Sequence, residues 1–290
     1  MGPSRLLSAA ILVALFAAPL RAQARVTIAP DRPMPGAVVR LTLHDTAPPG
    51  DSIVSVRGTM AGEPLHFVTE RGLRRALGAV PVDSTAAVEA RVIVTRRSGR
   101  ADTAMATAEV PPLPPPSEQL AVAPRFGRPM DAATAARVAR ENARALEVGR
   151  RSHRTPRLWR GSFLVPRESE ISSRFGTGRT FNGAVASRHL GVDFRGAVGA
   201  PIRASNAGVV ALVDRFFLGG RVVYIDHGEG VVTGYLHMSK VLVAAGDTVA
   251  RGQRIGLVGA TGRVTGPHLH WNARYGSLTV NPLDLVALDR

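Results

Sequence analysis

Apolar and polar residues alternate in short runs along residues 25–111, and clusters of Gly and Pro separate these runs. A period of two is typical of half-buried β-strands, and turns at this spacing favour an antiparallel sandwich. We therefore predict an Ig-like β-sandwich over residues 25–111. The expected strands are Arg25–Ala29, Val38–His44, Ile53–Arg57, His66–Thr69 and Ala87–Thr95.

The segment 112–160 breaks this pattern. The Pro-rich run Pro111–Pro116 predicts an extended, semi-rigid linker. An Ala-rich stretch then predicts a helix over residues 131–148, with Asp131 as its N-cap and Gly149 as its stop. This helix and the 25–111 domain are the candidate docking surfaces for a regulatory protein partner.

Residues 161–290 return to a β pattern without a long helical repeat. Runs rich in β-branched residues lie between Gly-rich turns and predict strands. An antiparallel all-β domain over 161–290 is the consistent interpretation, so the whole chain is predicted to be mainly β. The clearest of these strands are Val209–Val213, Arg221–Ile225, Val231–His237 and Arg254–Val258.

The first 24 residues have the pattern of an export signal. Arg5 supplies the positive charge, Leu6–Leu20 is the apolar core, and Ala22–Ala24 is a small-x-small cleavage site. The apolar core is shorter than the roughly 20 residues that span a bilayer, although an uncleaved anchor is the alternative. We expect an exported protein of the periplasm or cell envelope, or a secreted one, without stable membrane insertion once the signal is removed.

Charge and cysteine content narrow the classes of function. The net charge of +15 suits a polyanionic partner. However, the arginines are spread along the chain and no basic motif interleaved with aromatic residues occurs, so nucleic acid is not an expected partner. The chain has no cysteine, which excludes thiol catalysis, thiolate metal sites and disulfides.

Five side chains that can bind metal or carry protons stand out in the C-terminal part of the chain. Two histidines and a carboxylate are a familiar ligand set for a catalytic zinc with one open position. Two further histidines would remain for proton transfer. The five residues are His189, Asp193, His237, His268 and His270.

Spacing places these residues in two pairs. His189 and Asp193 are four residues apart and would share one face of a strand, with Gly191 leaving room for a metal between them. His268 and His270 would also point the same way from a strand. The spacing does not decide which histidine of this second pair binds the metal.

The other four histidines lack a comparable pattern. His227 lies at the entry of a turn, and we expect it to form a hydrogen bond within its hairpin. His44 and His66 are isolated, which favours surface or structural roles. His153 lies in a basic segment and is expected to be exposed to solvent.

A longer series of motifs runs in order from residue 171 to residue 282. Together, these motifs resemble the lysostaphin-type zinc endopeptidases, the family that includes the LytM-like cell-wall hydrolases. The motifs are Ile171-Ser-Ser-Arg-Phe-Gly176, His189-x-x-x-Asp193-Phe, Ala200-Pro-Ile-x-Ala204, Tyr235-x-His237-x-Ser239, Gly246-Asp-x-Val-x-x-Gly252, Gly259-x-Thr-Gly262, Gly266-Pro-His-Leu-His270 and Val280-Asn-Pro282.

This resemblance implies a role for each of the five residues. His189, Asp193 and His270 correspond to the zinc ligands, and His237 and His268 to the catalytic histidines. The implied substrate is peptidoglycan, cut within its peptide stems or cross-links during cell-wall remodelling. The alternative is a cell-wall-binding or amidase-activating module that uses the same fold without hydrolysis. The complete set of five residues favours the enzyme.

Overall fold

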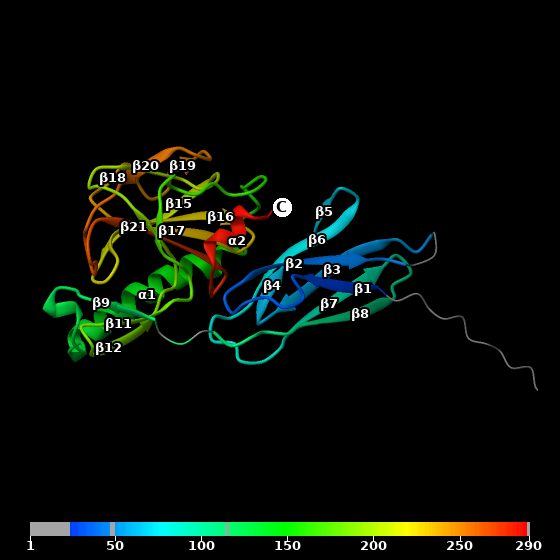
Figure 1. The fold of residues 1–290 in the computed structure, drawn as a ribbon. Helices are drawn as coiled ribbons and strands as arrows, with labels where there is room; N and C mark the ends of the chain where they lie inside the picture. The colour runs from blue at the N-terminus through cyan, green and yellow to red at the C-terminus, as the bar shows by residue number, and fades with distance from the viewer. Residues whose placement is uncertain (1–23, 47–49, 114, 116, 289–290) are drawn as a thin grey trace, which may run out of the picture.

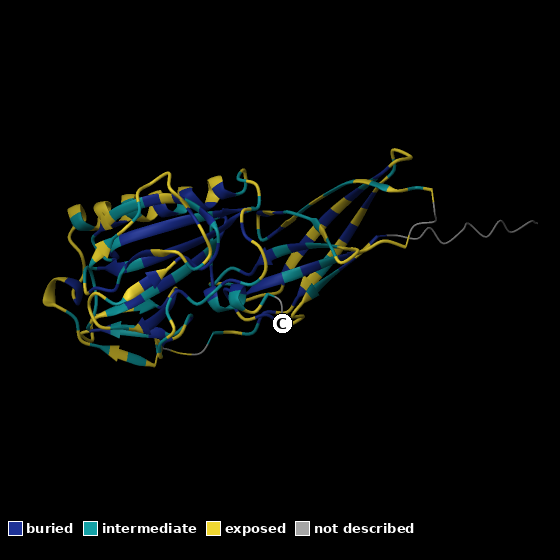
Figure 2. Cartoon of the chain, turned by 90° about the horizontal axis from the view of Figure 1, so that it is seen from above, coloured by how far each residue is buried: buried dark blue, intermediate teal, exposed yellow. Residues whose placement is uncertain are grey.

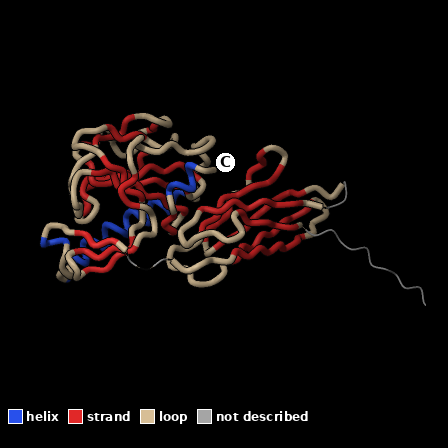
Figure 3. The backbone as a smooth tube through the Cα atoms, in the orientation of Figure 1, coloured by secondary structure: helices blue, strands red, loops and turns tan. Residues whose placement is uncertain are grey.

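The computed structural model describes residues 24–46, 50–113, 115 and 117–288, which form two β-rich lobes (Figure 1). Strands dominate both lobes, so the prediction of a mainly β protein is confirmed (Figure 3). The predicted export signal lies outside the described residues, apart from Ala24. Within the described ranges, no helix is both long enough and apolar enough to cross a membrane.

The N-terminal lobe, residues 24–113, consists of two four-stranded antiparallel sheets that share one apolar core. Alternate residues of each strand face this core, as in β7, where every second residue is buried. The first sheet has the order β1 (Arg25–Ala29), β2 (Val38–His44), β6 (Leu73–Ala79) and β5 (Val68–Glu70). The second has the order β4 (Glu63–Leu65), β3 (Ile53–Met60), β7 (Val88–Arg96) and β8 (Ala101–Ala108).

The sequence predicted some of these strands with the right bounds and missed others. Strands β1 and β2 have the predicted bounds, β3 is longer than expected, and β7 is shifted by one residue. The strand expected at His66–Thr69 is wrong in position, because β5 begins only at Val68. Strands β6 and β8 were missed because Arg residues interrupt the first, and the inward positions of the second are mostly Ala. The Ig-like topology stays a prediction.

The long helix α1 (Ala132–Ser152) begins as predicted but ends later. The Asp131 carboxylate accepts a hydrogen bond from the Thr134 backbone N–H and caps the first turn. The predicted stop at Gly149 is wrong, because this glycine serves a close approach instead of a termination. A Cβ atom at Gly149 would lie 2.0 Å from the carbonyl oxygen of Gly276 in the C-terminal lobe.

The C-terminal lobe, residues 161–288, is built on an eight-stranded antiparallel sheet, and α1 packs against this sheet. In Figure 2 its central strands are dark blue along most of their length, which marks the lobe's main core. The strand order is β10 (Ile171–Ser173), β13 (Val192–Arg195), β21 (His268–Tyr275), β17 (Val231–Met238), β16 (Gly220–Gly228), β15 (Gly208–Phe216) and β19 (Thr248–Val249), with β22 (Leu278–Val280) also paired to β21.

Two small sheets and a short helix complete this lobe. One sheet contains a strand from the linker, β9, which pairs in parallel with β11 and so brings the linker against the lobe. Its order is β12 (Val185–Arg188), β11 (Gly178–Phe181) and β9 (Glu118–Leu120). The other has the order β14 (Pro201–Arg203), β20 (Arg254–Leu257) and β18 (Lys240–Val241). The short helix is α2 (Pro282–Val286), and the linker also contains a 3-10 turn (Pro124–Phe126).

A buried polar network joins the two lobes at the end of α1. The Nε2 of His153 donates a hydrogen bond to the Glu63 carboxylate at 2.8 Å, and its Nδ1 lies 2.9 Å from the Nε2 of His66. Glu63 also accepts a hydrogen bond from the backbone N–H of Ser277. The prediction that His153 is exposed is therefore wrong, because the N-terminal lobe covers it.

Asp284 connects the lobes at a second point. Its carboxylate accepts hydrogen bonds from the Val38 backbone N–H at 2.9 Å and from the Asn281 side chain at 3.1 Å. Burial raises the pKa of Asp284 to about 6, because these two hydrogen bonds only partly offset the loss of water around the charge. The ionised carboxylate therefore destabilises the folded protein near neutral pH.

We expect Gly149→Ala to destabilise the protein by about 1–3 kcal/mol, because the added methyl group meets the Gly276 carbonyl. Helix propensity alone would instead stabilise this variant by up to about 1 kcal/mol. Denaturant unfolding measures the difference. Ala143→Gly at an exposed position of the same helix calibrates the propensity contribution. A Gly149→Ala variant more stable than the wild type would contradict the close packing of α1.

We expect Asp284→Asn to gain stability relative to the wild type as the pH rises from 4 to 7. The folded pKa of Asp284 lies near 6, above the unfolded value near 4, so wild-type stability falls across this window as the carboxyl group ionises. The relative gain should reach about 1–3 kcal/mol in unfolding experiments. Asp83→Asn, on the exposed surface, controls for the loss of one negative charge. A constant difference between pH 4 and 7 would contradict the assignment.

Candidate metal centre and active-site groove

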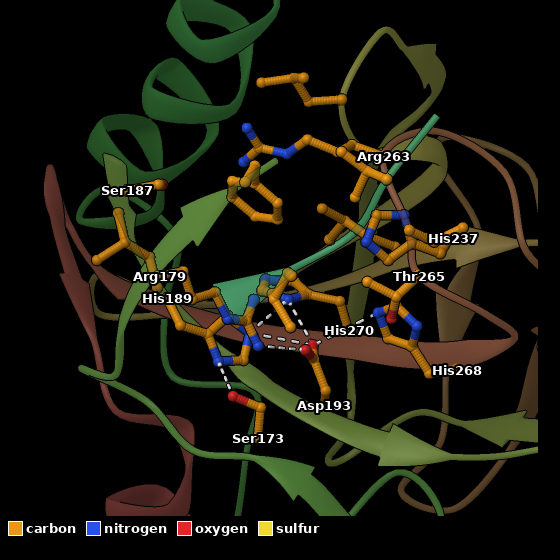
Figure 4. A pocket seen from close by; sticks show the side chains of 18 of the residues that line it. Ser173, Arg179, Ser187, His189, Asp193, His237, Arg263, Thr265, His268 and His270 are labelled. Carbon is orange, nitrogen blue, oxygen red and sulfur yellow. Dashed lines mark hydrogen bonds and ion pairs between the residues drawn. The ribbon is translucent and has the colours of Figure 1, made fainter. Parts of the chain in front are cut away.

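Three ligand atoms from separate segments converge on one point of the C-terminal lobe (Figure 4). The Nε2 of His189 lies 3.0 Å from the Oδ1 of Asp193 and 3.0 Å from the Nδ1 of His270. The third side of this triangle, between His270 and Asp193, is 2.9 Å. Strand pairing explains part of the arrangement, because Asp193 on β13 lies directly opposite His270 on β21.

His189 reaches the triangle from a loop, so the prediction that it shares a strand with Asp193 is wrong. Strand β12 ends at Arg188, and β13 begins only at Val192. Between them the chain leaves the small sheet and enters the large one. Gly191 is required at this crossing, since a Cβ there would lie 2.5 Å from the Nε2 of His270. The glycine thus makes room for a ligand side chain.

The donor set fits a zinc ion. The Nδ1 of His189 donates a hydrogen bond to the carbonyl oxygen of Arg174 at 2.9 Å, so its Nε2 presents a lone pair to the triangle. The Asp193 oxygen and the His270 Nδ1 face the same point. Three such atoms repel one another unless a cation lies between them. Tetrahedral zinc, with bonds of about 2.0–2.1 Å to N and O, holds its ligands about 3.3 Å apart, which is close to the observed spacing.

The protonation states suit metal binding. Burial alone would raise the pKa of Asp193, but hydrogen bonds and charge interactions with His189 and His270 hold it well below its usual range. Burial lowers the pKa of His270 to about 4, and the Asp193 carboxylate only partly opposes this shift. At neutral pH the carboxylate is ionised and the His270 imidazole is neutral, which are the forms that bind a metal ion.

A chain of polar side chains supports the triangle from behind. The guanidinium group of Arg179 donates to the Oδ2 of Asp193 at 2.7 Å and to Glu118 at 2.8 Å. Glu118 also accepts a hydrogen bond from the hydroxyl of Ser173 at 2.7 Å. Arg179 therefore occupies the outer oxygen of Asp193 and leaves Oδ1 facing the triangle.

Sequence reasoning missed Glu118 and Arg179. Glu118 belongs to the linker and lies 61 positions before its partner Arg179. Parallel pairing between β9 and β11 brings these residues together, and no local spacing indicates such a pairing. Ser173 lies within a motif that the family resemblance includes, but the motif alone does not indicate its contact.

His237 and His268 lie next to the triangle and are oriented in the same way. The Nδ1 of His237 donates to the carbonyl oxygen of Thr261 at 2.8 Å, and the Nδ1 of His268 donates to that of Gly266 at 2.9 Å. Each Nε2 is therefore the atom left for chemistry. The ring centroids are 4.9 Å apart, and the Nε2 of His268 lies 3.7 Å from the Asp193 carboxylate. Burial lowers the pKa of His237 well below its usual value.

All five residues selected from the sequence line one groove of about 440 Å³. The linker and α1 contribute to its wall, through residues such as Glu118 and Asn142. Three arginines also line it, namely Arg179, Arg188 and Arg263. The geometry brings the candidate ligands and the candidate catalytic histidines together, and their roles remain predictions.

His227 is separate from this groove. Its ring is fully buried, with its Nδ1 2.7 Å from the Ala207 carbonyl oxygen and its Nε2 2.8 Å from the hydroxyl of Thr233. Thr233 lies across the hairpin formed by β16 and β17, so the predicted structural contact is present. Burial lowers the pKa of His227 to about 4, which keeps the ring neutral.

Known proteins resemble the part of the chain that carries the groove. The profile of Peptidase family M23 matches residues 187–282. The peptidoglycan DD-endopeptidase ShyA of Vibrio cholerae is 47% identical over 95 residues, which are 33% of this chain and 22% of ShyA. The DD-carboxypeptidase/endopeptidase Mpg of Neisseria meningitidis is 44% identical over 98 residues, which are 34% of this chain and 23% of Mpg. The matched segment thus spans less than a quarter of either relative.

One solved structure resembles both lobes. It is a crystal structure from Pseudomonas aeruginosa named for family M23, which is 28% identical to this chain with a TM-score of 0.66. The alignment covers 88% of this chain and 95% of that structure. The matched range, residues 187–282, contains all five site residues. Residues 187–282 of this chain therefore form a domain of Peptidase family M23, as the resemblance to lysostaphin-type peptidases predicted.

Proposed function

We propose that this protein is a zinc-dependent endopeptidase that hydrolyses peptide bonds in the stems or cross-links of peptidoglycan. The observation that carries the proposal is the triangle of His189, Asp193 and His270 beside two histidines of fixed orientation. The relative ShyA is named for peptidoglycan, which supports the substrate class, and both ShyA and Mpg are named as endopeptidases. These names also favour hydrolysis over the alternative of a module that only binds the cell wall or activates an amidase.

In this proposal each residue has a defined task. The ligands His189, Asp193 and His270 would hold a zinc ion, which supplies a Lewis acid for the scissile carbonyl and lowers the pKa of a bound water. His237 and His268 expose their Nε2 atoms to the groove. One neutral imidazole accepts the proton of the attacking water, and an imidazolium then donates a proton to the leaving amine. Before this transfer, the Nε2–H of the imidazolium stabilises the negative charge that develops on the carbonyl oxygen.

The proposed location follows from the substrate. Peptidoglycan lies outside the cytoplasmic membrane, and the first 24 residues have the pattern of an export signal. We therefore propose that the protein acts in the periplasm or cell envelope. The net charge of +15 favours association with an anionic wall polymer.

Substitutions should separate metal binding from proton transfer. We expect His189→Ala and His270→Ala to lose both zinc and activity, because each removes one of three ligands. His237→Ala should keep its zinc but lose about 10²–10⁴-fold in turnover. Zinc content is measured by atomic absorption, and turnover by mass spectrometry of digests of cross-linked muropeptides. His44→Ala, exposed in the N-terminal lobe, is the control. A zinc-loaded wild type that releases no peptide from any muropeptide would sink the proposal.

We expect the contacts of Arg179 and Glu118 behind Asp193 to increase the affinity for zinc. We expect Arg179→Ala to weaken zinc binding by about 10–100-fold, because it removes the donor that orients the carboxylate. Glu118→Gln should have a smaller effect in the same direction, since it acts through Arg179. Competition with a chromogenic chelator measures both. Arg195→Ala is the control, because Arg195 lies on the same strand as Asp193 but pairs with Glu170 at the surface. Equal affinities in all variants would contradict this role.

A further inference from the structure

Arg263 is a charged side chain in the groove for which the described part of the chain provides no acidic partner. Its guanidinium group lies 4.1 Å from the centre of the Phe181 ring. Figure 4 shows it reaching across the groove on the side of His237. The neighbouring Arg179 differs in this respect, because it pairs with both Glu118 and Asp193. One positive charge in the groove wall is therefore not compensated within the described residues.

The backbone fixes Arg263 in relation to His237. The backbone N–H of Arg263 donates to the Leu218 carbonyl at 2.8 Å, and the Thr261 carbonyl, two residues earlier, accepts the hydrogen bond from His237. Gly262 between them has a φ of +81°, and a Cβ there would lie 2.4 Å from the backbone of Gly220. The same tight turn therefore orients the imidazole of His237 and holds Arg263 beside it.

The surroundings of Arg263 make an uncompensated charge unfavourable. Burial, together with the nearby charge of Arg179, lowers its pKa to about 10, so the group is still protonated at neutral pH. Stacking on Phe181 returns only part of the cost of removing the guanidinium from water. The stacked arrangement leaves the N–H groups at the edge of the guanidinium plane for a planar anion, and a carboxylate matches this geometry with two hydrogen bonds.

We propose that Arg263 is a specificity-determining residue that binds a free carboxylate of the substrate close to the scissile bond. This inference rests on the proposed endopeptidase function and names the chemical class of peptide that the groove selects. A peptide with an acidic group near the cleaved amide would supply the missing negative charge. The corresponding amide would leave Arg263 without a partner and would be a poorer substrate.

The test compares two substrates and four proteins. The substrates are a cross-linked peptide dimer whose diamino acid bears a free carboxylate next to the scissile bond, and the same dimer with that carboxylate amidated. The full-length zinc-loaded proteins are the wild type, Arg263→Gln, Arg263→Lys and Arg188→Gln. Arg188 lines the same groove but donates to the Gly176 carbonyl at 2.6 Å, so its substitution controls for the loss of one positive charge from the wall.

We expect Arg263→Gln to lower kcat/KM on the free acid by about 10–100-fold, mainly through KM, and to leave the amidated dimer unchanged. Arg263→Lys should retain part of the preference, and Arg188→Gln most of it. Zinc content and melting temperature verify that each variant is folded and loaded.

Three outcomes would count against the proposal. Equal cleavage of both dimers by the wild type, or an equal loss of preference in Arg188→Gln and Arg263→Gln, overturns the role of Arg263 while the endopeptidase function stands. Cleavage of neither dimer by the wild type overturns the endopeptidase function and this inference together.

Discussion

The register between β13 and β21 is the constraint on which the site depends. Antiparallel pairing sets Asp193 opposite His270 and Arg195 opposite His268, so two candidate ligands and one candidate catalytic histidine follow from one alignment of strands. A slip of one residue would turn each side chain to the other face of the sheet. The buried side chains of Phe194 and Leu269, which face each other in the same pairing, oppose such a slip because it would expose them.

Backbone carbonyl groups orient the imidazoles that this register brings together. The carbonyls of Arg174, Thr261 and Gly266 each accept a hydrogen bond from one Nδ1–H, in His189, His237 and His268 respectively. Each of these rings is thereby held in one tautomer with its Nε2 towards the groove. The loops that supply the carbonyls are themselves held by tight turns, such as the one at Gly262. The site is preorganised by the main chain, which limits the rearrangement needed for metal or substrate binding.

The sequence predicted the parts of the molecule that depend on local pattern or on a shared motif. The central strands of the C-terminal lobe were located because β-branched residues dominate them, and α1 began at its predicted cap, Asp131. Local pattern could not reveal contacts between distant segments. The end of α1 depends on the fit of Gly149 against another turn, the burial of His153 depends on the N-terminal lobe, and the place of Arg179 depends on a strand from the linker.

The linker strand β9 contributes to the groove although it lies outside the segment that matches the family. The family match begins at residue 187, yet Glu118 and Arg179 stand behind the Asp193 carboxylate and lie outside the match. A gene fragment cut at the family boundary, or at residue 161, would encode all five site residues but would lack the linker strand. In such a fragment, Ser173 and Arg179, where they are retained, would lose their contacts with the Glu118 carboxylate. The set of residues that positions the Asp193 carboxylate is therefore larger than the segment that the family comparison recognises.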